Sequence, residues 1–124
     1  METRSSGSVR IFWLDKPKIL ACLRVGAAHL AERKPEVEAI WLFGSLARGD
    51  AVPGSDADVL VIVATSDQPF HARAPSFAVG SCGIGVDLFV YTSAEFAGLR
   101  ETRPRFYRTL LSERQVLYTR SPQA

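Results

Sequence analysis

Three short apolar runs, rich in β-branched and aromatic residues, limit the folds that are open to this chain. They cover residues 37–43, 58–64 and 84–91, and turn-forming residues lie close to the ends of each run. Runs of this length and composition are typical of buried strands. The pattern predicts a small sheet built from these runs, and residues 115–119 are a candidate for a further strand.

Helical patterns lie around the predicted strands. Residues 15–33 carry an apolar stripe at helical spacing, and three further helices are expected after residue 45. The stripe consists of Ile19, Leu23, Ala27 and Leu30. The later helices are expected at 46–50, capped by Ser45, at about 92–102, started by a Thr92–Glu95 capping box, and at 104–114. Residues 70–79 give no clear pattern. The chain is therefore predicted to be an α/β (α+β) domain with helices packed against a small sheet.

The length and composition favour a single domain. The 124 residues are expected to form an N-terminal segment (1–14), a domain (15–120) and a short tail (121–124). A net charge of +2 is too small to indicate a nucleic-acid partner, and no apolar run is long enough to predict a membrane span. Cys22 and Cys82 have no metal-type spacing and indicate no disulfide framework, which favours a reducing cytoplasm.

Acidic residues interrupt two of the predicted strands. Asp56 and Asp58 lie where the second strand begins, and Asp87 lies inside the third. Side chains alternate along a strand, so Asp56 and Asp58 are expected on one face, where Asp87 joins them if the strands are neighbours. Carboxylates held together in this way suit Mg²⁺ or Mn²⁺, and three of them can hold two such ions for phosphoryl-type transfer. Alternatively, the first two cap the strand start, or Asp87 pairs with an arginine.

A glycine–serine pair supplies a second candidate feature. Gly44 and Ser45 follow the first strand and precede a short helix, where backbone N–H groups and the helix dipole favour an anion. Arg48 follows one turn later and either contacts a phosphate or orients an aspartate. A phosphate cradle beside a metal site predicts a nucleoside triphosphate site.

The stretch GSLARGDAVPGSDADVLV resembles the GS-x10-DxD signature of the DNA polymerase β-type nucleotidyltransferase superfamily. The GS-x-ARG form and the short chain are similar to the minimal nucleotidyltransferase group, whose members are commonly antitoxins paired with a HEPN-domain toxin. The resemblance extends over residues 19–118 and implies a nucleotidyltransferase fold with a small mixed sheet. Pro75 and His71, in residues 70–80, depart from the pattern, and no helical domain like that of larger relatives is expected within residues 15–120.

The resemblance implies a role for each of these residues. Gly44 and Ser45 would hold the β- and γ-phosphates of ATP, with Arg48 beside them. Asp56 and Asp58 would bind both metals, and Asp87 would bind the catalytic metal and help to deprotonate the attacking hydroxyl. The implied reaction transfers AMP to a tyrosine hydroxyl of the toxin.

Two other functions stay open at this point. The chain could transfer a nucleotide to a small molecule, as aminoglycoside-modifying relatives do, or it could be an antitoxin that acts by binding alone. The exposed apolar residues Phe106 and Tyr107 are candidates for the partner surface, and the oligomeric state stays open.

Overall fold

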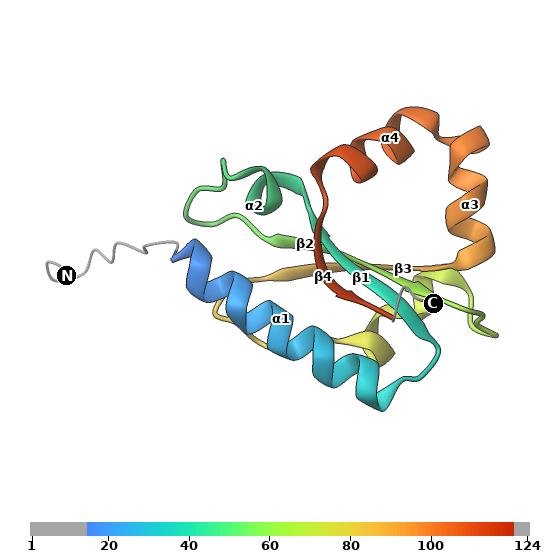
Figure 1. Ribbon diagram of the computed structural model, residues 1–124, viewed down its shortest axis with the longest axis horizontal. Coiled ribbons are helices and arrows are strands. Elements are labelled where there is room, and N and C mark those ends of the chain that lie inside the picture. The colour runs from blue at the N-terminus through green and yellow to red at the C-terminus, as the bar shows by residue number, and fades with distance from the viewer. Residues whose placement is uncertain (1–14, 121–124) are drawn as a thin grey trace, which may run out of the picture.

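A four-stranded mixed sheet forms the centre of the computed structural model, which describes residues 15–120 (Figure 1). The elements are α1 (Lys16–Arg33), β1 (Val37–Phe43), α2 (Gly44–Arg48), β2 (Ala57–Val63), the 3-10 helices η1 (Phe70–Ala72) and η2 (Ala74–Phe77), β3 (Val86–Thr92), α3 (Ser93–Thr102), α4 (Pro104–Glu113) and β4 (Gln115–Thr119). The predicted α+β class is confirmed, as is the strand over residues 115–119.

The strand order is β3-β2-β1-β4. The central strand β1 pairs antiparallel with both β2 and β4, whereas β2 and β3 are parallel. Phe43 at the end of β1 lies opposite Asp58, and Asp58 lies opposite Asp87 of β3. The end of β1 and the beginnings of β2 and β3 therefore meet at one end of the sheet.

Helix α1 covers one face of the sheet, and its predicted apolar stripe is the part that is buried (Figure 1). Asp15 caps the helix, because its Oδ1 accepts a hydrogen bond from the Lys18 N–H at 3.1 Å. Gly26 lets α1 approach the backbone of Val79, since a Cβ at this position would overlap with the Val79 carbonyl. Of the helices within residues 15–120, none is long and apolar enough to cross a membrane.

Helices α3 and α4 cover the opposite face and enclose a second apolar cluster (Figure 1). Its buried members are Trp41, Leu60, Ile62, Leu99 and Leu110. Phe106 and Tyr107 are partly buried against this cluster, so the expectation that both are freely exposed was wrong. The predicted capping box is confirmed, with Thr92 and Glu95 exchanging hydrogen bonds at the start of α3.

The segment that gave no clear sequence pattern is held by a buried arginine. Arg73 is only 4% exposed and donates to Glu95 Oε1 at 2.6 Å and Oε2 at 3.0 Å. It also donates to the carbonyls of Gln68 and Val90. The 3-10 helices on either side of Arg73 are thereby fixed to β3 and α3.

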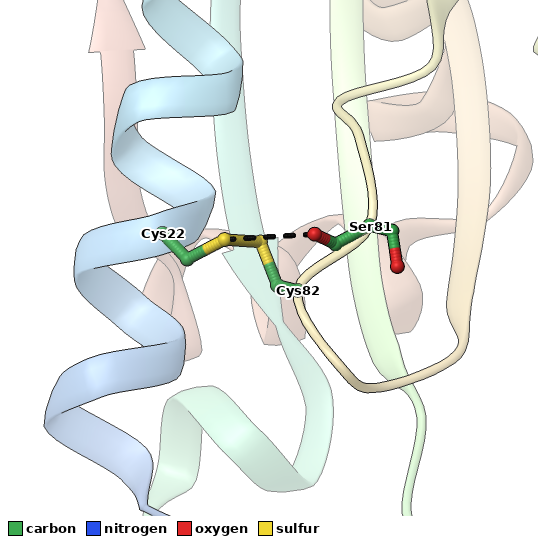
Figure 2. The surroundings of a disulfide bond; sticks show 3 residues. All are labelled: Cys22, Ser81 and Cys82. Atoms are coloured by element: carbon green, nitrogen blue, oxygen red, sulfur yellow. Dashed lines mark hydrogen bonds between the residues drawn. A yellow bond between two sulfur atoms is a disulfide. The ribbon is translucent and has the colours of Figure 1, made fainter.

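Cys22 and Cys82 form a disulfide, which contradicts the expectation of unpaired cysteines (Figure 2). The bond joins α1 to the loop that leads into β3, and the Ser81 carbonyl oxygen lies 3.8 Å from Cys22 Sγ. This is a contact and not a hydrogen bond, because a disulfide sulfur has no hydrogen to donate. The two cysteines lie 60 residues apart, so no local spacing could indicate the pairing.

Candidate active site

The three predicted acids lie at the beginnings of the two parallel strands. Asp56 directly precedes β2, Asp58 is its second residue and Asp87 is the second residue of β3. Asp58 and Asp87 are register partners, so their main chains are separated by the ordinary strand spacing of about 4.8 Å. Alternation along β2 places Asp56 and Asp58 on the face of Leu60, which α3 and α4 cover further along the sheet. The topology therefore places the three acids at the same end of the sheet.

The Asp58 carboxyl is affected both by burial and by its two acidic neighbours. Burial is the main cause that raises the pKa of its carboxyl, and the charges of Asp87 and Asp56 raise it further. Asp56 and Asp87 are both exposed, whereas Asp58 is half-buried between them. Within residues 15–120, no three histidine, cysteine, aspartate or glutamate side chains are gathered tightly enough to form a ready-made metal centre.

The glycine–serine turn lies directly against Asp58. Gly44 has φ +78°, and a Cβ at this position would overlap with the Asp58 carboxylate. Glycine is therefore required here both for the left-handed conformation and for the close approach. Helix α2 begins at Gly44 with no side-chain cap, so the expectation that Ser45 caps this helix was wrong. Ser45 is instead its second residue, and it remains half-buried beside the turn.

A second glycine packs against Asp56 and was not singled out from the sequence. Gly85 precedes β3, and a Cβ there would overlap with the Asp56 carboxylate. Its carbonyl accepts a hydrogen bond from the Ala57 N–H at 2.8 Å, which starts the pairing of β2 with β3. The loop that carries the disulfide therefore ends in direct contact with the acidic site. The third strand was predicted over residues 84–91, so Gly85 was expected inside it, but β3 begins two residues later, at Val86.

Arg48 is held by two carboxylates beside the turn. Its Nε donates to Asp50 Oδ2 at 3.2 Å, and its Nη1 donates to both carboxylate oxygens of Glu113 at 3.3 Å. The hydrogen bond to Asp50, together with those to Glu113, raises the pKa of the Arg48 guanidinium. Arg48 therefore contacts two acidic side chains, Asp50 and Glu113, and its contact with a phosphate stays a prediction.

Glu113, like Gly85, is a residue of the site that was not singled out from the sequence. It is the last residue of α4, and its Oε1 also accepts a hydrogen bond from the Gly44 N–H at 3.3 Å. Its neighbours in sequence are serine and arginine, which gave the appearance of a solvated helix end. Only the packing of α4 against α2 brings it to the turn, so no local signal could have identified it.

Together, these elements define a small mixed-sheet domain in which acids from two parallel strands meet a glycine turn after a neighbouring strand. The chain belongs to the nucleotidyltransferase domain family, whose sequence profile matches residues 27–117. The match includes the glycine–serine turn, the three acids and Glu113. No curated protein matches the chain.

Several solved structures share the fold. One, from Sulfolobus solfataricus and assigned as a nucleotidyltransferase, has a TM-score of 0.62 at 20% identity over 85% of this chain and 84% of that chain. A toxin–antitoxin structure with AMP-PNP has a TM-score of 0.50 at 24% identity, over 89% of this chain and 77% of that chain. A mutant of the toxin–antitoxin MntA–HpeT has a TM-score of 0.53 at 21% identity, over 89% of this chain and 77% of that chain. The predicted nucleotidyltransferase fold is therefore confirmed.

Proposed function

We propose that this chain is an antitoxin that transfers AMP from ATP to a hydroxyl group of a partner toxin. The acceptor is a tyrosine hydroxyl of a HEPN-type toxin, and the reaction requires Mg²⁺ or Mn²⁺. The observation that carries the proposal is the register of Asp58 with Asp87, beside Asp56 and the Gly44 turn, in a nucleotidyltransferase domain.

The donor groups of the site fit a divalent cation. Asp56, Asp58 and Asp87 offer only oxygen ligands, which suit Mg²⁺ and Mn²⁺ better than Zn²⁺. The pKa of Asp58 is raised in part by its two acidic neighbours, a repulsion that a bound cation would relieve. When bound, the metal would neutralise the carboxylates and polarise the phosphates of the nucleotide.

The side chains and backbone around the acids have separate tasks. The Gly44 N–H, the Ser45 hydroxyl and the Arg48 guanidinium supply hydrogen-bond donors for the β- and γ-phosphates. Asp87 is exposed and its carboxylate accepts the proton of the attacking hydroxyl. The oxygen of that hydroxyl forms a bond to the α-phosphorus, and pyrophosphate leaves with the electron pair of the bond that breaks.

Two features of the similar structures support the donor and the partner. One toxin–antitoxin structure contains AMP-PNP, an analogue of ATP. Another is a mutant in which two aspartates, two positions apart as Asp56 and Asp58 are, have been replaced by glutamate. A cytoplasmic location, where ATP is available, belongs to the same proposal.

The test is transfer of label from α-³²P-ATP to a HEPN-type toxin that forms a complex with this chain, with Mg²⁺ present. The Asp56→Asn/Asp58→Asn double variant is expected to lose the label on the toxin. Asp67→Asn is the matched control, because Asp67 is exposed in the loop after the opposite end of β2. If the double variant still neutralises the toxin fully, the chain acts by binding alone. Transfer to an aminoglycoside but not to the toxin would instead select the small-molecule function.

A further inference from the structure

Glu113 occupies the hydrogen-bond donors that the proposed function assigns to phosphate. Its Oε1 accepts from the Gly44 N–H and from Arg48 Nη1, and its Oε2 accepts from the same Arg48 nitrogen, all at 3.3 Å. The side chain of Glu113 is only 18% exposed, so the carboxylate is enclosed in the site and does not extend into solvent. A carboxylate and a phosphate both present negatively charged oxygens to such donors.

We propose that Glu113 is an internal competitor of the nucleotide, whose carboxylate holds the Gly44 and Arg48 donors until a triphosphate displaces it. This inference rests on the proposed function, because it assumes that these donors bind the triphosphate. It assigns to Glu113 control over nucleotide affinity and no part in the chemical step.

The Gly44 and Arg48 donors cannot make full hydrogen bonds to the Glu113 carboxylate and to a phosphate at the same time. A backbone N–H has one hydrogen, so the Gly44 amide cannot make a full hydrogen bond to Glu113 and to a phosphate oxygen at once. The carboxylate would also repel a triphosphate placed beside it. Triphosphate binding at these donors therefore requires Glu113 to leave.

The hydrogen bonds of Glu113 are longer than is usual for a carboxylate. Charge-assisted hydrogen bonds of this kind are usually about 2.7–2.9 Å long, and those of Glu113 are 3.3 Å. Glu113 also ends α4, where the negative end of the helix dipole disfavours an acid. Helix stability therefore does not account for an acid at this position, whereas its contact with the two donors does.

The surrounding chain can stay in place when the carboxylate moves. The hydrogen bond of Arg48 to Asp50 uses Nε, whereas Glu113 contacts Nη1, so it does not depend on the position of Glu113. After Glu113, the Arg114 guanidinium lies 4.4 Å from the centre of the Trp41 ring, and Gln115 Nε2 donates to the Ala47 carbonyl at 2.8 Å. The displacement therefore needs only rotation of the Glu113 side chain.

The test compares the wild-type chain with Glu113→Gln, which keeps the size of the side chain and removes its charge. Calorimetry with magnesium tripolyphosphate and with magnesium ATP gives the affinities, and the transfer assay gives KM and kcat. We expect Glu113→Gln to tighten both ligands and to lower the KM for ATP by about five- to tenfold, with little change in kcat. Glu32→Gln is the control, because Glu32 is exposed in the last turn of α1 and is expected to change neither value.

The possible results separate the two proposals. If the wild type transfers AMP but Glu113→Gln binds triphosphate equally or more weakly, the inference is overturned and the proposed function stands. If neither protein binds triphosphate or transfers AMP, both are overturned. Should Glu113→Gln fail to fold, Glu113→Asp keeps the charge on a shorter side chain, and it too is expected to tighten ATP.

Discussion

Asp58 and Asp87 lie directly opposite each other on the parallel strands β2 and β3. Two carboxylates in register on one face repel each other, and burial adds to this cost at Asp58. An arrangement of this kind is unfavourable for the stability of the fold. Its presence in a nucleotidyltransferase domain is consistent with a site in which these acids are retained for function.

Asp58→Asn is expected to reduce nucleotidyl transfer by at least about 100-fold without lowering the free energy of unfolding near neutral pH. The pKa of Asp58 is raised, mainly by burial and then by its acidic neighbours, so the charged carboxylate is disfavoured in the folded state. An acid with a raised pKa lowers stability once the pH exceeds its unfolded pKa, and the neutral amide removes this effect. Urea denaturation in the presence of a chelator measures the stability, and a lower midpoint for the variant would contradict the prediction.

Gly44→Ala is expected to cost more stability than Gly49→Ala. Both glycines have a left-handed φ, +78° and +89°, so each alanine carries a penalty of roughly 1–2 kcal/mol. Only at Gly44 does the new Cβ also overlap with the Asp58 carboxylate, whereas nothing lies within 4 Å of the Cβ position at Gly49. Thermal unfolding and the transfer assay on the two variants measure the difference. Equal losses of stability and activity would show that the contact with Asp58 does not matter.

Glu95 is expected to make the fold sensitive to acid. The hydrogen bonds from Arg73 are the largest cause that lowers the pKa of Glu95 to about 2 from its ordinary value of 4.5. A lowered pKa contributes stability above the unfolded value, and this contribution is lost as the pH falls from about 4.5 towards 2. Denaturation over this pH window should show a smaller loss for Glu95→Gln than for the wild type. Glu101→Gln, on the exposed side of the same helix, is expected to behave as the wild type does.

Reduction of the Cys22–Cys82 disulfide is expected to lower the free energy of unfolding by about 4 kcal/mol. The bond closes a loop of 60 residues, and the chain-entropy estimate for a loop of this size is about 4 kcal/mol. Urea denaturation with and without reductant measures the change. The Cys22→Ser/Cys82→Ser variant should have the same free energy of unfolding as the reduced protein, with or without reductant. If reductant does not change the free energy of unfolding of the wild type, the prediction is contradicted.

The elements could be predicted from the sequence because their signals are local. The stripe on α1, the apolar run of β1 and the capping box of α3 each depend on residues a few positions apart. The three acids were also found in this way, since a charge inside an apolar strand is costly unless it has a purpose. Their convergence was a conditional prediction, because it required β2 and β3 to be neighbours.

The features that sequence reasoning missed depend on contacts between distant segments. The hydrogen bonds of Glu113 to Gly44 and Arg48, the ion pair of Arg73 with Glu95 and the disulfide all join residues that are far apart in the chain. The residues that flank these side chains in the sequence give no signal of such partners. For that reason Glu113 was not singled out from the sequence, and the cysteines were expected to be unpaired.

The parallel pairing of β2 with β3 has a consequence for how this site can vary. Main-chain hydrogen bonds fix the separation of Asp58 and Asp87. Residues can therefore be added to or removed from the stretch 64–84 without changing this separation, provided that Gly85 and Val86 still meet Ala57. A slip of one residue in that ladder would instead turn Asp87 to the face that α1 covers. The connection between β2 and β3 can therefore change in length without loss of the site. A shift of β3 by one residue in its pairing with β2 would lose it.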